Sequence, residues 1–448
     1  MVAKTSLKTR LGFGVGEFSS SIFFTVTSFW LMNFLTDEVR LSAALAGTAL
    51  LVGKIWDAII DPFIGHISDR TRTRWGRRRP YLLFFSIPFG IAFVIMFTNP
   101  GIPDQIGKFI WAMLIYTILC IVYSFTNIPY NALLPELSDD YNERTSISGF
   151  KQVFAVFGTL LGAGAALPIM GLFATRTAGF TGMAAVFGFL GTISLLVTFF
   201  SVREPSHGIQ PVAERIWKSL KDVFTNRPYL LLLASWFTNS MAVAVAESML
   251  IYYYKYIFQD EYAVTLAMIS LLVATILTFP LWIWISKKIG KKGAYLIGMS
   301  LTIVAVLVIA FTADLIGVNS TLVLMILAGV GFGAHYVLPW SMVPDTIEYD
   351  YACSGVRREG IYYSLWTFVI AFGGALAGFI VGQGLEIFEY IPDIVQSARS
   401  ILGIRLLIGP IPAALFLLGN LAIAFYPLTR KRYEEIQAQI RERDVGKA

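Results

Sequence analysis

The sequence predicts an all-α membrane protein with about twelve transmembrane helices in two halves of six. Hydrophobic residues make up 56% of the 448 residues and charged residues only 14%, whereas soluble proteins carry about 25% charged residues. The apolar residues also fall in long runs joined by short links, and a helix needs roughly 20 such residues to cross a bilayer. The length therefore leaves no room for a separate soluble domain.

Charged residues, prolines and glycines bound the expected helices in chain order. In the first half we expect helices near 11–36, 41–68, 81–97, 109–133, 147–173 and 179–202. In the second half we expect them near 229–258, 263–285, 294–312, 321–343, 361–385 and 403–426. The expected domains are an N-terminal half (1–202), a cytoplasmic central linker (203–228), a C-terminal half (229–426) and a cytoplasmic tail (427–448).

Lysine and arginine gather at both termini and in alternate links, most densely in the arginine-rich link after the second expected helix. Short basic links stay on the cytoplasmic side of a membrane. We therefore expect a multi-pass protein of the bacterial inner membrane with both termini in the cytoplasm. The same alternation explains the net charge of +6 without a nucleic-acid partner.

The two halves repeat each other at their basic links, which is typical of transporters. DRTRTRWGRRRP (69–80) corresponds to KKIGKKG (287–293), and PYNALLPEL (129–137) to PWSMVPDT (339–346). Acidic and basic residues at these helix ends can pair across the bundle. We expect a cytoplasmic gate there, or else simple topology signals in the headgroup zone. The gate residues would be Glu136, Glu143, Arg144, Asp345, Arg357, Arg358 and Glu359.

The segment KIWDAIIDP (54–62) places three charges inside the second expected helix. Asp57 and Asp61 are one turn apart on one helix face, and Lys54 lies over the same stripe. Each charge costs at least about 2.5 to 3.5 kcal/mol at bilayer depth, so such residues mark functional sites. With all three ionised the local charge is minus one. A single proton or monovalent cation would neutralise it, which suggests cation coupling with Lys54 as the balancing charge; a structural ion-pair cluster is the alternative.

Further polar and aromatic side chains recur at helical spacing in several expected helices. Amides, hydroxyls and aromatic faces suit a polyhydroxylated ligand, and they suit other amphipathic solutes too. Candidate substrate-binding residues are Glu17, Ser21, Asn127, Asn131, Lys151, Gln152, Glu247, Tyr336 and Trp366.

Three segments resemble the glycoside-pentoside-hexuronide:cation symporters of the major facilitator superfamily, the family of the bacterial melibiose carrier. They are KIWDAIIDPFIGHISDRTRTRWGRRRPYLL, NIPYNALLPEL and PDTIEYDYACSGVRREGIYYS. The resemblance extends over nearly the whole chain. It implies a major facilitator fold with alternating access driven by proton or sodium entry. It also implies cation binding by Asp57 and Asp61, with hydroxyl ligands at Ser124 and Thr367.

The chain departs from the melibiose carrier where that protein binds its cation and its sugar. Ile60 replaces an asparagine ligand, which removes one oxygen from a sodium shell and favours a proton. Ungapped counting matches Ser21 and Asn127 to its galactoside-binding acids, Asn131 to its tryptophan and Gln152 to its arginine. Ala371 stands where many relatives carry a lysine. The resemblance therefore does not imply melibiose as the substrate.

These observations predict a secondary active transporter, functional as a monomer, that carries a sugar, glycoside or uronide with a proton, or less readily with sodium. We expect no other cofactor or metal, and the bilayer and a small solute as partners. An amphipathic or lysolipid-like solute is an alternative. An intramembrane aspartyl protease is a remote one, because its two acids would come from different helices, whereas Asp57 and Asp61 share one. We therefore expect no enzymatic activity.

Overall fold

The computed structural model describes residues 6–137, 141–204, 223–355 and 359–445, and these are helical apart from short links. In the first half of the chain the helices are α1 (Leu7–Val26) with the π-helical turns η1 (Thr27–Leu31) and η2 (Phe34–Glu38), α2 (Ala43–Arg70), α3 (Arg79–Met96), α4 (Gln105–Leu137), α5 (Tyr141–Gly164), α6 (Ala166–Met170) and α7 (Arg176–Ser201). In the second half they are α9 (Arg227–Tyr253) with the π-helical turn η3 (Tyr254–Phe258), α10 (Ala263–Leu277), α11 (Phe279–Ser354), α12 (Glu359–Ile387), α13 (Ala398–Ile408), α14 (Pro410–Ala424) and α15 (Arg430–Val445).

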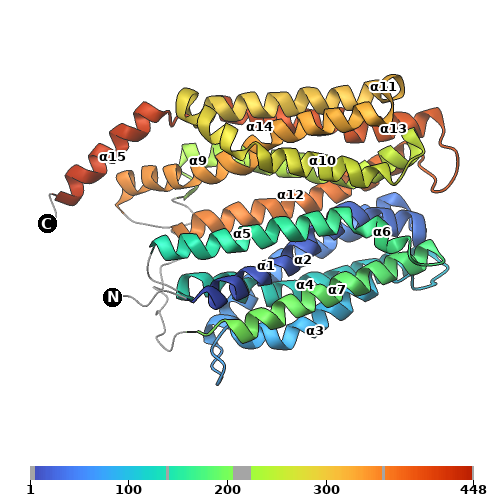
Figure 1. The fold of residues 1–448 in the computed structure, drawn as a ribbon, viewed down its shortest axis with the longest axis horizontal. Helices are drawn as coiled ribbons and strands as arrows, with labels where there is room; N and C mark the ends of the chain where they lie inside the picture. Colours follow the sequence, from blue (N-terminus) through green and yellow to red (C-terminus); the bar gives the residue numbers. More distant parts are fainter. Residues whose placement is uncertain (1–5, 138–140, 205–222, 356–358, 446–448) are drawn as a thin grey trace. The chain divides into compact units, whose positions relative to one another are not determined.

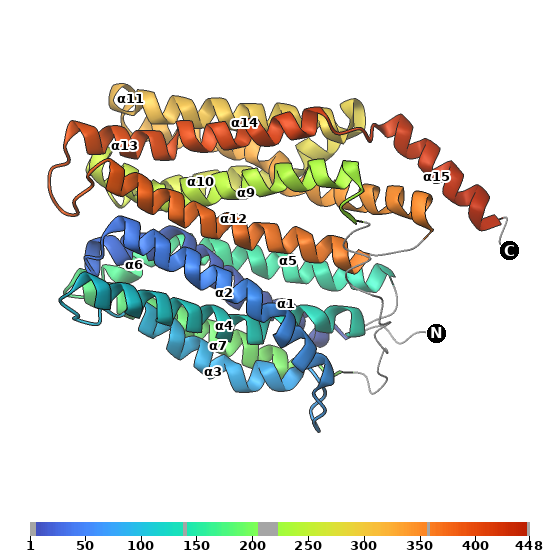
Figure 2. The same ribbon diagram turned by 180° about the vertical axis from the view of Figure 1, so that it is seen from behind.

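The helices form two compact units. Unit 1 comprises Met1–Pro211 and Gly378–Gln396, and unit 2 comprises Val212–Ala377 and Ser397–Ala448. Within unit 1, α1 packs against α5 and α7, α3 against α4 and α7, and α2 against α4 (Figure 1 and Figure 2). Within unit 2, α9 packs against α14, and α11 against α10, α14 and α15. Helix α12 is shared, because the division between the units falls inside it.

Ten helices in the described part of the chain are long and apolar enough to cross a membrane. They overlap ten of the expected spans, but the ends differ in both directions: α4 and the last part of α11 extend further into polar sequence, whereas α5 ends at Gly164 instead of near 173. The two remaining expected spans are also helical. The first corresponds to α1 with η1 and η2, and the eighth is divided between α10 and the start of α11.

Helix α11 contains the end of the eighth expected span and the whole of the ninth and tenth. Gly290 and Gly317 adopt positive φ angles of 83° and 70°, which interrupt the helical backbone. The interruptions divide α11 into 279–289, 291–316 and 318–354. Glycine is suited to both positions because it lacks the Cβ atom that disfavours positive φ.

The first helices of the two halves end in the same way. Helix α1 leads into the π-helical turn η2, after which Arg40 has a φ of 59°. Helix α9 leads into the π-helical turn η3, after which Gln259 has a φ of 57°. Such π turns are rare and often occur at functional sites. The shared ending adds a structural similarity to the sequence repeat between the halves.

Glu204, which follows α7, anchors the arginine-rich link to α3. Its carboxylate accepts hydrogen bonds from the backbone N–H groups of Arg77, Arg78 and Arg79 at 2.6 to 2.8 Å. These N–H groups begin α3, where no carbonyl of the preceding turn is available to them. A carboxylate at a helix N-terminus also interacts favourably with the helix dipole. Glu204 therefore holds the start of α3 against the end of α7.

We expect Glu204→Ala to lower the free energy of unfolding by about 1–3 kcal/mol, because it leaves backbone donors without their acceptor. The midpoint of thermal unfolding in detergent measures this loss. Glu434→Ala is the control, since Glu434 forms an exposed pair with Arg430 on α15, a kind of pair worth about 0.2–1 kcal/mol. Equal shifts in both variants would contradict the anchoring role.

Candidate functional site

The charged cluster lies in the middle of α2. Lys54 Nζ pairs with Asp57 Oδ2 at 3.0 Å, and Asp57 Oδ1 accepts a hydrogen bond from Ser124 Oγ of α4 at 2.8 Å. Asp57 is only 5% exposed. Both of its carboxylate oxygens therefore have a partner, one cationic and one a hydroxyl.

Asp61, unlike Asp57, has a carboxylate oxygen without a hydrogen-bond partner. It interacts electrostatically with Asp57, Lys54 and Ser124, but its buried Oδ1 atom has no hydrogen-bond partner. A buried carboxylate oxygen without a donor is costly. One ammonium group thus serves two carboxylates, and an oxygen remains available to a proton or a cation.

Aromatic rings hold the Lys54 ammonium beside Asp57. Lys54 Nζ lies 5.4 Å from the ring centre of Phe23 and 5.8 Å from that of Phe24, both on α1, and it interacts with Tyr116 and Cys120 of α4. A cation over an aromatic face is attracted by the ring quadrupole. Three helices of unit 1 thus fix the position of this charge.

A chain of polar contacts continues along α4. Asn127 Nδ2 donates to Ser20 Oγ of α1 at 2.8 Å, and Asn131 Nδ2 donates to Asn127 Oδ1 at 2.9 Å. Lys151 of α5 donates to Asn131 Oδ1 at 2.6 Å and pairs with Glu17 of α1 at 3.2 Å. The structure brings together four of the candidate substrate-binding residues, Glu17, Asn127, Asn131 and Lys151.

The neighbouring candidates in unit 1 lie differently. Ser21 is buried in the contact between α1 and α5, where a Cβ atom on Gly158 would come within 2.8 Å of it. Gln152 is exposed. Ser20, which sequence reasoning missed, makes the contact to Asn127 instead. Three consecutive serines carry no sequence signal that tells them apart, because helix packing alone decides which one faces α4.

In unit 2 the candidates surround a group of stacked rings. Trp366 is fully buried and stacks on Trp236 at 4.5 Å, and Trp236 stacks on His335 at 4.6 Å. Neither indole N–H has a hydrogen-bond partner. Tyr336 is 40% exposed and interacts electrostatically with Glu247.

Thr367 also belongs to unit 2. Its hydroxyl donates to the backbone carbonyls of Tyr363 and Ser364 in its own helix, at 3.1 and 3.0 Å. Such bonds are common for threonine in helices. Its part in a cation site with Asp57 and Asp61 stays a prediction.

Of the expected gate, the structure describes only one side chain. Asp345 pairs with Lys291 at 2.6 Å, and Lys291 also donates to the carbonyl of Ser341. Both partners belong to the basic links and helix ends that repeat between the halves. The side chains of Glu136, Glu143, Arg144, Arg357, Arg358 and Glu359 lie outside the described residues, and the gate stays a prediction.

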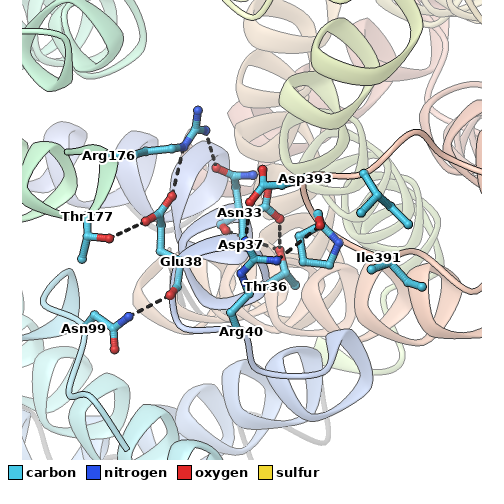
Figure 3. Close-up of polar contacts among 12 residues, drawn as sticks. Asn33, Thr36, Asp37, Glu38, Arg40, Asn99, Arg176, Thr177, Ile391 and Asp393 are labelled. Carbon is cyan, nitrogen blue, oxygen red and sulfur yellow. Dashed lines mark hydrogen bonds and ion pairs between the residues drawn. The ribbon is translucent and has the colours of Figure 1, made fainter. Parts of the chain in front are cut away.

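A second polar cluster lies beyond the C-terminal end of α1, around η2 (Figure 3). Glu38 pairs with Arg176 at 3.2 Å and accepts from Thr177 at 2.6 Å. Arg176 also donates to Asn33 Oδ1 at 3.2 Å, and Asn99 donates to the Glu38 carbonyl. Sequence reasoning missed this cluster, because charges at the ends of expected spans look like boundary residues.

The sequence and fold were compared with known proteins. A profile of the MFS/sugar transport protein family matches residues 12–430. This chain belongs to that family. Its glycoside-pentoside-hexuronide symporter membership and its major facilitator fold, both predicted from the sequence, are confirmed. Since the family and its structural neighbours are transporters, the protein is a multi-pass membrane transporter and not an enzyme.

Individual relatives cover nearly the whole transporter. It is 30% identical to the isoprimeverose transporter of Lactiplantibacillus pentosus, over 94% of this chain and 88% of that protein. It is 30% identical to the glucuronide carrier protein homolog of Escherichia coli K12, over 99% and 97% of the two chains. The inward-open structure of the E. coli xylose transporter XylE superimposes with a TM-score of 0.62 at 17% identity, over 96% and 98%.

We expect Lys54→Met to reduce the free energy of unfolding by about 3–5 kcal/mol, because breaking a buried pair leaves an uncompensated charge. Adding Asp57→Asn in the same chain should restore part of the loss. Thermal unfolding of both single variants and the double variant gives the coupling energy. A double variant that loses the sum of the single losses would show that the two side chains do not stabilise each other.

Proposed function

We propose that the protein is a secondary active symporter that couples entry of one monovalent cation to uptake of a sugar or glycoside by alternating access. The charge balance of the α2 cluster supports this most directly. Two carboxylates with one lysine leave a net charge of minus one in a helix that crosses the membrane. A mobile cation that binds there and leaves again would neutralise that charge in each cycle.

We propose a proton as the coupling ion in preference to sodium. Hard metal cations are held by several oxygen ligands, and the side chains near the cluster in unit 1 offer few. They are the carboxylates of Asp57 and Asp61, the Tyr116 hydroxyl, which interacts with Lys54, and the Ser124 hydroxyl, which already donates to Asp57. Ile60 contributes no oxygen. A proton needs only one carboxylate oxygen, and Asp61 Oδ1 has no other partner.

The solute class rests on the polar residues of α1, α4 and α5 and on relatives. The amides of Asn127 and Asn131 and the serines of α1 can hydrogen-bond hydroxyl groups. Two of the relatives described above are an isoprimeverose transporter and a glucuronide carrier protein homolog. We place the protein in the bacterial inner membrane, as a monomer with both termini in the cytoplasm, in agreement with its basic links.

Proteoliposomes test both parts of the proposal. An inward proton gradient should drive accumulation of a labelled sugar, and a protonophore should abolish it. An inward sodium gradient at equal pH should drive none. Sodium-driven uptake would replace the proton with sodium, and flux of a lysophospholipid with no sugar uptake would contradict the sugar assignment.

We expect Asp57→Asn to abolish uphill uptake, because the substitution removes one negative charge and leaves Lys54 with Asp61 alone, so that the cluster has no net charge to attract the coupling ion. Radiolabelled uptake by vesicles under an imposed gradient measures this, with membrane insertion checked by immunoblot. Glu435→Gln on α15 is the control, since it removes an exposed carboxylate paired with Arg432. Uphill uptake at the normal rate in Asp57→Asn would contradict the coupling role.

A further inference from the structure

The relatives leave open whether the sugar is neutral or acidic, since one of them is a glucuronide carrier homolog. The charges inside unit 1 bear on this question. An acidic sugar needs a positive side chain that is free to pair with it, because burying an unpaired anion is very costly. Lys54 and Lys151 are the lysines in the middle of the described helices of unit 1, and each already pairs with a carboxylate.

Lys151 is the more accessible of the two. Its side chain is 24% exposed, against 10% for Lys54. Its ammonium lies between Glu17 Oε2 at 3.2 Å and Asn131 Oδ1 at 2.6 Å, and 5.5 Å from the ring centre of Tyr130. The charge of Lys151 is therefore compensated by Glu17, and two of its three N–H donors are directed to protein atoms.

An incoming carboxylate would have to share the single positive charge of Lys151 with Glu17, which leaves one negative charge uncompensated, or displace Glu17 from it. That exchange would leave the Glu17 carboxylate, whose Oε2 is buried, without its cationic partner. Removing one partner of a buried pair is strongly unfavourable. A neutral sugar meets no such obstacle, because it exchanges hydrogen bonds with the amides and leaves the ion pair intact.

We propose that the Glu17–Lys151 pair makes the transporter select neutral glycosides over uronides and sulfonated sugars. This inference rests on the proposed sugar transport and assigns Glu17 a role in specificity. Glu17 neutralises Lys151, and the lysine, held by Asn131, orients the amide chain toward Asn127. Removal of the Glu17 charge would expose a cation to acidic ligands.

Matched sugars that differ only at C6 test the proposal. Methyl β-D-glucoside and methyl β-D-glucuronide, with the corresponding galactoside and galacturonide, serve as uptake substrates in proteoliposomes. We expect the wild type to transport at least one neutral sugar about tenfold or more faster than its acidic counterpart, and Glu17→Gln to shift that ratio about tenfold or more toward the acid. In Glu17→Asp, which keeps the charge, the ratio of neutral to acidic sugar uptake should stay close to the wild-type ratio. In Glu434→Gln on α15 it should equal the wild-type ratio.

The possible failures are distinct. Uptake of no sugar by the wild type would contradict the proposed function itself. Faster uptake of the uronide by the wild type, or an unchanged ratio in Glu17→Gln, would overturn the specificity inference alone. If Glu17→Gln does not fold, Lys151→Met provides the second test. A site that selects neutral sugars should still exclude the uronide in this variant, whereas a site that binds uronides would lose its uronide uptake.

Discussion

The structure depends on one electrostatic constraint, which is that α2 carries two carboxylates and one ammonium group in the middle of a membrane-spanning helix. Each charge is tolerable there only with partners. Lys54 provides one for Asp57, Ser124 of α4 provides another, and the rings of Phe23 and Phe24 on α1 surround the ammonium. The packing of α2 against α4 and the approach of α1 therefore follow from the need to keep this cluster away from lipid. Asp61 is left short of a donor, and this shortage is what a transported cation can relieve.

Much of this could be predicted from the sequence, because it follows from local spacing. Long apolar runs gave the helices, and the i, i+4 spacing of Asp57 and Asp61, with Lys54 at i−3, put the three charges on one face before any helix was placed. Ser124, by contrast, was expected at the cation site only because of the resemblance to the symporter family. Several helix ends differ by two turns or more from those expected, as at Gly164 of α5 and Ser354 of α11, because hydropathy does not register where helical hydrogen bonding begins or stops.

Features that depend on which helix packs against which were not predictable in this way. Ser20 and Ser21 have the same chemistry, yet one faces Asn127 and the other fills the contact with Gly158. Nothing in the periodicity of α1 indicates its π turn. The turn nevertheless directs Asp37 and Glu38 to different partners, Tyr390 and Arg176. Contacts between residues some 350 positions apart carry no local pattern at all.

Helix α4 joins the two kinds of site in unit 1. Ser124 contacts the charged cluster of α2, and Asn127, less than one turn further, begins the chain of contacts that ends at Lys151 and Glu17. A hydrogen bond to a carboxylate is stronger than one to a neutral acid, so neutralising Asp57 weakens the hold of α2 on α4 at Ser124. Any resulting shift of α4 also moves the amides of Asn127 and Asn131. By thermodynamic linkage, a sugar that prefers the shifted position must raise the affinity for the cation by the same factor. The proposed symport therefore needs no direct contact between sugar and ion, only a helix that contacts both proposed sites and has two positions available to it.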